Sequence, residues 1–151
     1  MKNIAVGIDF DESNQRIVET CEELAKALGC ELHLVHAFSP DPDYRGFGLY
    51  AYAYPGPDEY EAELRHEKEQ LRKVVDRLKQ KGLAAKGFMK PGESVHSILE
   101  FAEKHEADMI VVGSHSRNRL SRLLMGSVAE GVLHGSKVPV IVVPNKIAEE
   151  S

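Results

Sequence analysis

Short apolar runs alternate with longer amphipathic stretches along the chain. Five runs rich in apolar residues are expected to form strands, and they cover residues 3–9, 31–38, 84–90, 108–113 and 139–144. The first, fourth and fifth runs are almost continuously apolar, which is typical of parallel strands that are covered on both faces. Helical patterns separate the runs. This alternation predicts an α/β fold in which helices lie on both faces of a parallel sheet.

The helical patterns carry recognisable sequence signals. Gly29 is expected to end the helix between the first two strands. The residues expected to face inward from that helix are Ile17, Cys21, Leu24, Ala25 and Leu28. A longer helix is predicted over residues 58–81 and another over residues 95–102. With 151 residues, no internal repeat and no linker, the chain is expected to form one domain over residues 1–151.

The carboxyl edge of the predicted sheet is where a ligand is expected. In open α/β sheets, ligands bind beyond the carboxyl ends of the strands, at the point where the strand order reverses. Asp9 follows the first strand, Ala37 lies near the end of the second, and Gly113 ends the fourth. These positions predict a binding crevice, although Asp9 could instead cap the first helix or simply end its strand.

A leucine-rich stretch after the fourth strand is divided by Gly126. Ser127 is followed three residues later by Glu130, which is the spacing of a capping box, so a helix is predicted to start here. Gly135 is expected to end this helix. Its predicted inward residues are Val128, Val132 and Leu133.

The start of that helix is a candidate phosphate site. Unpaired amides at a helix start carry partial positive charge and suit an anion, phosphate above all. Gly126 lacks a Cβ atom, so it can adopt conformations that other residues avoid and lets a ligand approach the backbone. The turn from Gly113 to Ser116 can supply further amides from the other side of the crevice. The same spacing also describes an ordinary loop that leads into a well-capped helix.

Charge distinguishes this segment from the rest of the chain. The formal net charge is −5 and the isoelectric point is near 5.8, which argues against binding of nucleic acid or an anionic membrane through bulk charge. Residues 113–137, by contrast, hold four basic residues and one acidic residue. Arg117, Arg119 and Arg122 would raise the potential near a phosphate, or they could be solvated or paired with acidic helices.

The composition argues against several other classes of protein. No apolar run reaches membrane-spanning length, so no membrane insertion is expected, and the first residues lack the apolar stretch of a signal peptide. Cys21 and Cys30 form no Cys-x-x-Cys pair and are interpreted as reduced core thiols of a cytoplasmic protein. His33 and His36 should lie on opposite faces of one strand, and no metal site is expected.

One connection is unusually long. Residues 39–57 hold four of the five tyrosines and exceed the length of a simple loop. These tyrosines could form a lid over a ligand, a partner surface, or a patch packed on the second helix. They are Tyr44, Tyr50, Tyr52 and Tyr54.

The segment from Ile110 to Pro144 resembles the nucleotide-binding end of the universal stress protein family. The family signature is glycine, two residues, glycine, nine residues, and then glycine followed by serine or threonine. Gly113 matches the first glycine, Ser116 replaces the second, and residues 126–127 follow at the required distance. The opening "IAVGIDFDES" and the run "LVHAF" are also similar to the family, so the resemblance covers nearly the whole chain apart from the tyrosine-rich loop.

The resemblance implies a Rossmann-like, adenine nucleotide alpha hydrolase-like fold with strand order 3-2-1-4-5. In the ATP-binding branch of the family, it implies that Asp9 bonds a ribose hydroxyl and that Ile8 and Ala37 line the adenine pocket. Replacement of the second glycine by Ser116 is expected to weaken binding at most. The residues expected to contact ATP, with Mg²⁺ as an optional companion, are Gly7, Ile8, Asp9, Ala37, Gly113, Ser114, His115, Ser116, Arg117, Gly126, Ser127 and Val128.

Residues and resemblance together predict a cytoplasmic ATP-binding regulatory protein of the stress response, in which ATP biases conformation or partner choice. The absence of a Gly-x-x-x-x-Gly-Lys-[Ser/Thr] loop excludes a P-loop ATPase. No general base stands beside a nucleophile, so no catalytic residue is predicted, while slow ATP hydrolysis or autophosphorylation stays open. The rival hypothesis is a dimeric interaction module whose cleft holds no nucleotide.

The last strand is expected to mediate self-association. Pro139 precedes it, and proline is tolerated at the start of a strand or at a sheet edge. An apolar edge of this kind is normally covered in proteins. A homodimer, which the resemblance also implies, is therefore predicted, beside a protein partner whose identity the sequence does not indicate. The residues expected at its interface are Val140, Ile141, Val142 and Val143.

Overall fold

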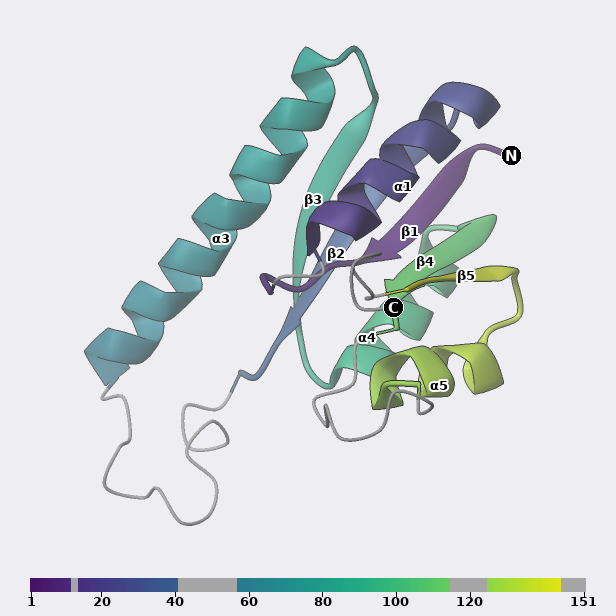
Figure 1. The fold of residues 1–151 in the computed structure, drawn as a ribbon. Coiled ribbons are helices and arrows are strands. Elements are labelled where there is room, and N and C mark those ends of the chain that lie inside the picture. Colours follow the sequence, from purple (N-terminus) through teal and green to yellow (C-terminus); the bar gives the residue numbers. More distant parts are fainter. Residues whose placement is uncertain (12–13, 41–56, 115–124, 145–151) are drawn as a thin grey trace, which may run out of the picture.

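Five strands and four helices make up the part of the chain that the structure describes. This structure is a computed structural model, and it describes residues 1–11, 14–40, 57–114 and 125–144 (Figure 1). The strands are β1 (Asn3–Gly7), β2 (Glu31–Phe38), β3 (Ala85–Pro91), β4 (Met109–Gly113) and β5 (Val140–Val143). The helices are α1 (Asn14–Leu28), α3 (Pro57–Gln80), α4 (Ser94–Lys104) and α5 (Ser127–Gly135).

The strands form one parallel sheet in the order β3-β2-β1-β4-β5. This confirms the predicted fold class and strand order. The central strand, β1, pairs with β2 on one side, where Gly7 lies opposite Val35. On its other side it pairs with β4, where Val6 lies opposite Val111. The strand order therefore reverses at β1, and the ligand crevice of this fold class lies at the carboxyl ends of β1 and β4.

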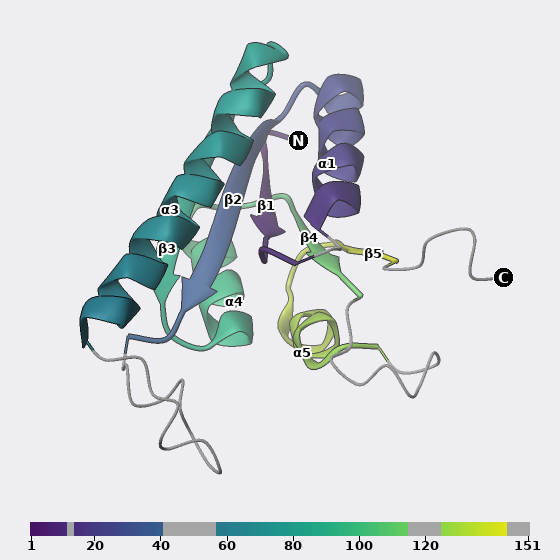
Figure 2. The same cartoon turned by 60° about the vertical axis from the view of Figure 1, so that its left-hand side comes forward.

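Helices cover both faces of the sheet, α1 and α3 on one face and α4 and α5 on the other (Figures 1 and 2). Because side-chain direction alternates along a strand, each face has its own apolar core. Ile4 and Val6 belong to the core under α1 and α3, whereas Ala5 belongs to the core under α4 and α5. Among the described residues, no helix is both long and apolar enough to cross a membrane.

Two helix ends show why the chain turns where it does. Gly29 follows α1 with a φ of 64°, a conformation that favours glycine, and its amide donates to the carbonyl of Ala25 at 2.8 Å. The predicted end of this helix is thus confirmed. Glu93 caps the start of α4, because its carboxylate accepts hydrogen bonds from the amides of Val95 and His96 at 2.8 and 2.9 Å.

The predicted capping box at the start of α5 is wrong. The N-cap residue is Gly126, with φ −62° and ψ 154°, and no side chain caps the helix. Ser127 is already the first helical residue, since the amide of Glu130 donates to the carbonyl of Gly126 at 3.0 Å. The φ of Gly126 is one that any residue adopts, so the glycine is not needed for an unusual backbone conformation.

Two leucines that were expected to face inward are exposed. Leu28 is the last residue of α1 and is 44% exposed, because the buried face of the helix is formed by Ile17, Cys21 and Ala25. In α5, Ala129 and Val132 are fully buried and form the helix face that packs on the sheet. Leu133 lies outside this face and is 42% exposed.

The cysteines lie in the interior, as expected. Cys21 and Cys30 are both buried and carry free thiols. Burial raises the pKa of the Cys21 thiol to about 12, so this sulfur stays protonated at neutral pH.

The long connection between β2 and α3 is tied at its two ends. The hydroxyl of Tyr60, a buried residue in the first turn of α3, donates to the carbonyl of Ser39 just after β2. The tyrosines whose role the sequence left open lie outside the described residues. These are Tyr44, Tyr50, Tyr52 and Tyr54.

Candidate functional site

The two halves of the glycine motif meet at the carboxyl edge of the sheet. Gly113 is the last residue of β4, and the amide of Ser114 donates to the carbonyl of Val143 at 2.9 Å. The amide of Gly126 donates to the carbonyl of Ser114 at 3.3 Å. Ser114 and Gly126, which are twelve positions apart in the sequence, are therefore held side by side.

The amino end of α5 lies at this edge. Gly126 is buried and Val128 is half-buried, whereas Ser127 is exposed. The first hydrogen bond within α5 uses the amide of Glu130, so the amides of the residues before it have no acceptor inside the helix. Together with the partial positive charge of a helix start, these amides suit an anionic group.

Asp9 projects from the turn between β1 and α1. Its side chain is 71% exposed, and its Oδ1 lies 4.0 Å from Nδ1 of His36. The same oxygen accepts a hydrogen bond from the amide of Phe10 at 3.2 Å. An exposed carboxylate at the end of the central strand can accept a further hydrogen bond from a ligand hydroxyl. A carboxylate that can accept from a ligand hydroxyl and a set of amide donors thus lie at the same edge of the sheet.

Three other predicted site residues lie beside that turn, and two of them have packing roles. Ile8 is 4% exposed and belongs to the core under α1 and α3. A Cβ atom at Gly7 would lie 2.8 Å from Cδ1 of Ile98 and 3.1 Å from Cγ1 of Val112, so glycine allows α4 to pack closely here. Ala37 is half-buried near the end of β2.

His36 is a residue of this edge that the sequence analysis did not assign to the site. It is 5% exposed, with Nδ1 3.0 Å from the carbonyl oxygen of Ile8 and Nε2 3.2 Å from Oε2 of Glu67 on α3. The predicted placement of His33 on the opposite face of β2 is confirmed, because that ring lies against Phe101 of α4. The sequence signal that could have identified His36 was its position as a polar residue within a buried strand, because a buried polar side chain requires hydrogen-bond partners.

A sequence model of the Universal stress protein family matches residues 1–144. The chain belongs to this family. Universal stress protein MJ0531 of Methanocaldococcus jannaschii is 32% identical over 144 residues, which cover 94% of this chain and 81% of that protein.

Solved structures of universal stress proteins share the fold of this chain. One in complex with cAMP is 25% identical with a TM-score of 0.67, and the match covers 96% of this chain and 98% of the other. A universal stress protein from Archaeoglobus fulgidus in complex with dAMP is 21% identical with a TM-score of 0.67, over 95% of this chain and 98% of the other. The fold that the resemblance implied is thus confirmed.

An acidic cavity of about 480 Å³ lies between helix α3 and the turn that carries Asp9 in this universal stress protein. Four of its seven lining residues are carboxylates. The lining residues are Asp9, Phe10, Asp11, Glu63, His66, Glu67 and Gln70. Within the described ranges, no group of three or more His, Cys, Asp or Glu side chains is placed to hold a metal ion.

Part of the predicted site lies outside the described residues of this universal stress protein. His115, Ser116 and Arg117 belong to residues 115–124, as do Arg119 and Arg122. Of the predicted set, the structure places Asp9, the end of β4 and the start of α5 at the same carboxyl edge of the sheet.

Proposed function

We propose that this universal stress protein binds an adenine nucleotide, with ATP as the leading candidate, and acts as a cytoplasmic regulatory protein. The observation that carries the proposal is the hydrogen bond from the amide of Gly126 to the carbonyl of Ser114, because it sets the start of α5 beside the end of β4. The relatives in complex with cAMP and dAMP support an adenine nucleotide as the ligand class.

The residues at this edge suit the parts of such a ligand. The exposed carboxylate of Asp9 would accept a hydrogen bond from a ribose hydroxyl. The amides of Ser127 and Val128, with the Ser127 hydroxyl, would donate to phosphate oxygens. Ala37 would contact the adenine ring, while the buried side chain of Ile8 would support the pocket from below.

The distribution of charge favours one orientation of the ligand. The cavity on the α3 side of Asp9 is lined by carboxylates, which repel phosphate. The start of α5 attracts phosphate, and residues 113–137 are basic on balance. The phosphates should therefore extend from Asp9 toward α5. A magnesium ion would then be carried by the phosphates, since the described residues offer no cluster of ligands for it.

Nucleotide release and a thermal shift test the proposal. The purified protein is denatured and the supernatant is analysed for nucleotides, and a second sample is heated with and without added ATP. At a hundredfold excess over Kd, binding stabilises the fold by about 2.7 kcal/mol. For a domain of this size, the expected rise in Tm is about 5–10 °C. A chain that releases no nucleotide and shows no shift with ATP, ADP or cAMP would instead be an interaction module with an empty cleft.

The same site raises a second question, which is whether the protein slowly hydrolyses ATP or phosphorylates itself. The chain offers no residue to which we assign catalysis, so ATP is proposed to act as a bound regulator. Incubation with ATP and quantification of ADP decides between a regulator and a slow ATPase or autokinase. Formation of ADP above the no-protein control, lost in Asp9→Ala, would establish turnover.

A homodimer through β5 is part of the proposed function. β5 stands at the edge of the sheet and pairs with β4 on its inner side. Val140, Ile141 and Val142 are half-buried, so an apolar strand edge borders solvent. Analytical ultracentrifugation at micromolar concentration should show a dimer that Ile141→Lys weakens. A wild-type chain that sediments as a monomer contradicts this arrangement.

A further inference from the structure

His36 joins three elements around the turn that carries Asp9. Its Nδ1 lies 3.0 Å from the carbonyl oxygen of Ile8, and its ring centroid lies 4.7 Å from that of Phe10. Its Nε2 lies 3.2 Å from Oε2 of Glu67 on α3. The ring is therefore bonded to the end of β1 on one side and to a distant helix on the other.

The chemistry of these contacts fixes the position of one proton. A carbonyl oxygen only accepts, so Nδ1 of His36 must carry a hydrogen and donate it to Ile8, while the hydrogen shared with Glu67 lies on Nε2 or on the carboxyl group. The ring is 5% exposed, which leaves water little access to replace a lost bond. A buried hydrogen bond to a carbonyl is costly to break, because the polar groups on both sides would lose their partners.

Both backbone polar groups of Ile8 are held by consecutive residues of β2. Its amide donates to the carbonyl of Val35 at 3.0 Å, and its carbonyl accepts from His36. Ile8 directly precedes Asp9. The chain is thus fixed one residue before the exposed carboxylate, and Phe10, one residue after it, packs against the same imidazole.

We infer that His36, oriented by Glu67, is a positioning residue for nucleotide binding: it fixes the turn after β1 so that the Asp9 carboxylate meets the ribose. This inference rests on the proposed function. It also makes α3 a contributor to affinity, although α3 supplies no residue to the predicted ligand contacts. Movement of α3 would reach the nucleotide through Glu67 and His36.

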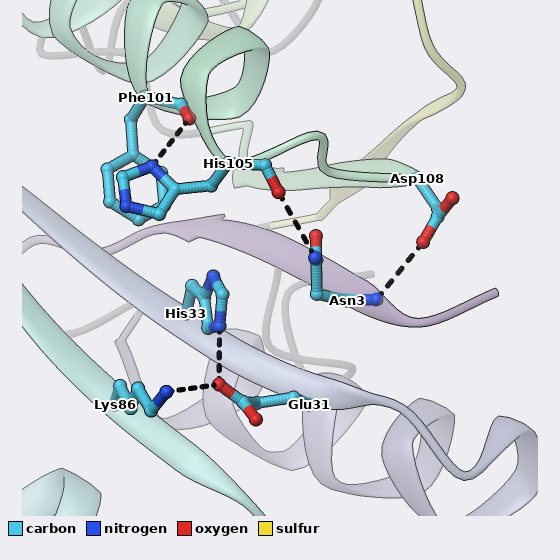
Figure 3. Close-up of polar contacts among 7 residues, drawn as sticks. All are labelled: Asn3, Glu31, His33, Lys86, Phe101, His105 and Asp108. Carbon is cyan, nitrogen blue, oxygen red and sulfur yellow. Dashed lines mark hydrogen bonds and ion pairs between the residues drawn. The ribbon is translucent and has the colours of Figure 1, made fainter.

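His33 is a matched control from the same strand. It is 8% exposed, and its Nε2 donates to Oε1 of Glu31 at 2.6 Å. Its Nδ1 is buried and has no hydrogen-bond partner within the part of the chain that the structure describes. The ring lies among Phe88, Phe101 and His105 on the α4 face. Figure 3 shows its bond to Glu31. A His33 variant therefore reports the general cost of removing a buried imidazole from β2.

The binding experiment compares ATP affinity by isothermal titration calorimetry in wild type, His36→Leu, His36→Asn and His33→Leu. Loss of a buried hydrogen bond at the turn should weaken ATP binding about tenfold in His36→Leu. His36→Asn keeps a donor near the position of Nδ1 and should recover most of the affinity. His33→Leu should stay within about twofold of wild type, since its ring makes no contact with the turn.

Glu67→Ala keeps the test decisive if His36→Leu does not fold. Glu67 lies on α3, outside the sheet, with its side chain 18% exposed, and the Tm of Glu67→Ala checks that the variant folds. It should weaken ATP binding by a smaller factor than His36→Leu, because the bond to Ile8 remains. Wild-type affinity in a folded His36→Leu protein, or equal losses in His33→Leu and His36→Leu, would overturn the inference. If His36→Leu does not fold, wild-type affinity in Glu67→Ala overturns it.

The state of the imidazole in the free protein gives a readout that needs no nucleotide. Nitrogen-15 NMR of the histidine rings should show a proton on Nδ1 of His36, whereas His33 should carry its proton on Nε2. An unprotonated Nδ1 on His36 overturns the positioning role. If wild type binds no nucleotide, the proposed function fails and the nucleotide part of this inference fails with it. If wild type binds ATP and His36→Leu binds it equally well, this inference alone fails.

Discussion

Two histidines of β2 are buried to nearly the same extent, yet their surroundings differ in kind. His33 and His36 are 8% and 5% exposed and lie on opposite faces of the sheet, since His33 contacts α4 and His36 contacts α3. His33 packs edge-on against aromatic rings, with one carboxylate partner at the amino end of the strand. His36 bonds to the backbone of β1 at the carboxyl end and to a glutamate of α3.

The difference reflects the two ends of the sheet. At the amino end, polar groups are tied to one another. The amide of Asn3 donates to Asp108 and the Asn3 side chain donates to the carbonyl of His105 (Figure 3). The amide of Lys2 also donates to Asp108. At the carboxyl end, Asp9 stays exposed and the first amides of α5 have no acceptor inside the helix. The amino end should therefore determine stability, and the carboxyl end ligand binding.

The largest predicted effect is on the aromatic cluster around His33. Phe101 is 1% exposed and stacks on His105 with ring centroids 3.9 Å apart. Phe101→Ala should lower the free energy of unfolding by about 3–5 kcal/mol, measured by urea denaturation. ATP affinity, measured well below the reduced Tm, should not change. A loss of affinity in the folded variant would break the separation between the two ends.

Gly7→Ala should have an intermediate effect, and it tests a residue that was predicted to contact ATP. The new Cβ atom would lie 2.8 Å from Cδ1 of Ile98 and 3.1 Å from Cγ1 of Val112. Overpacking of this kind lowers stability by about 1–3 kcal/mol. Tm should fall while ATP affinity changes little. An unchanged Tm with weakened ATP binding would place Gly7 in the ligand site.

The smallest predicted effect depends on pH and concerns Asp108. The amides of Lys2 and Asn3 donate to its carboxylate at 2.7 and 3.1 Å, and these bonds hold the pKa of Asp108 below its usual value. Because the folded-state pKa is lowered, the stabilisation is present above the unfolded pKa of about 3.9 and is lost as pH falls through the folded value.

Thermal melts of Asp108→Ala across a pH series measure this effect. The variant should have a lower Tm than wild type at pH 7, and the gap should narrow as pH falls below about 4. A difference in Tm that stays constant into strong acid would show that the charge of the Asp108 carboxylate contributes nothing to stability.

The sheet is the part that the sequence predicts best. All five strands follow from their apolar runs, with ends that differ by at most two residues: 31–38 is also the observed range of β2, and 3–9 was expected where β1 is Asn3–Gly7. The reason is that both faces of the central strands are buried, so Ile4, Val6 and Val111 had to be apolar whichever side they face. The strand order followed from the family resemblance.

The details of the candidate site could not be predicted in the same way. The spacing of Ser127 and Glu130 fits a capping box, but spacing does not reveal which residue first takes helical dihedral angles, and here Gly126 is the cap. The role of His36 depends on Glu67, which lies 31 positions away and reaches the ring only because α3 packs on β2. Contacts of this kind, between residues far apart in the sequence, can be identified only when the fold is known.

The central claim is that the start of α5, left open by Gly126, receives the phosphates of an adenine nucleotide. Valine adopts the dihedral angles of Gly126 without backbone strain, and because Gly126 is buried, the Tm of Gly126→Val checks that the protein folds with the larger side chain. Gly126→Ser, with a smaller side chain and a good helix cap, serves as the matched control. Titration calorimetry should show ATP affinity weakened by about tenfold or more in Gly126→Val, and less in Gly126→Ser. A folded Gly126→Val protein that binds ATP as tightly as wild type would contradict the account.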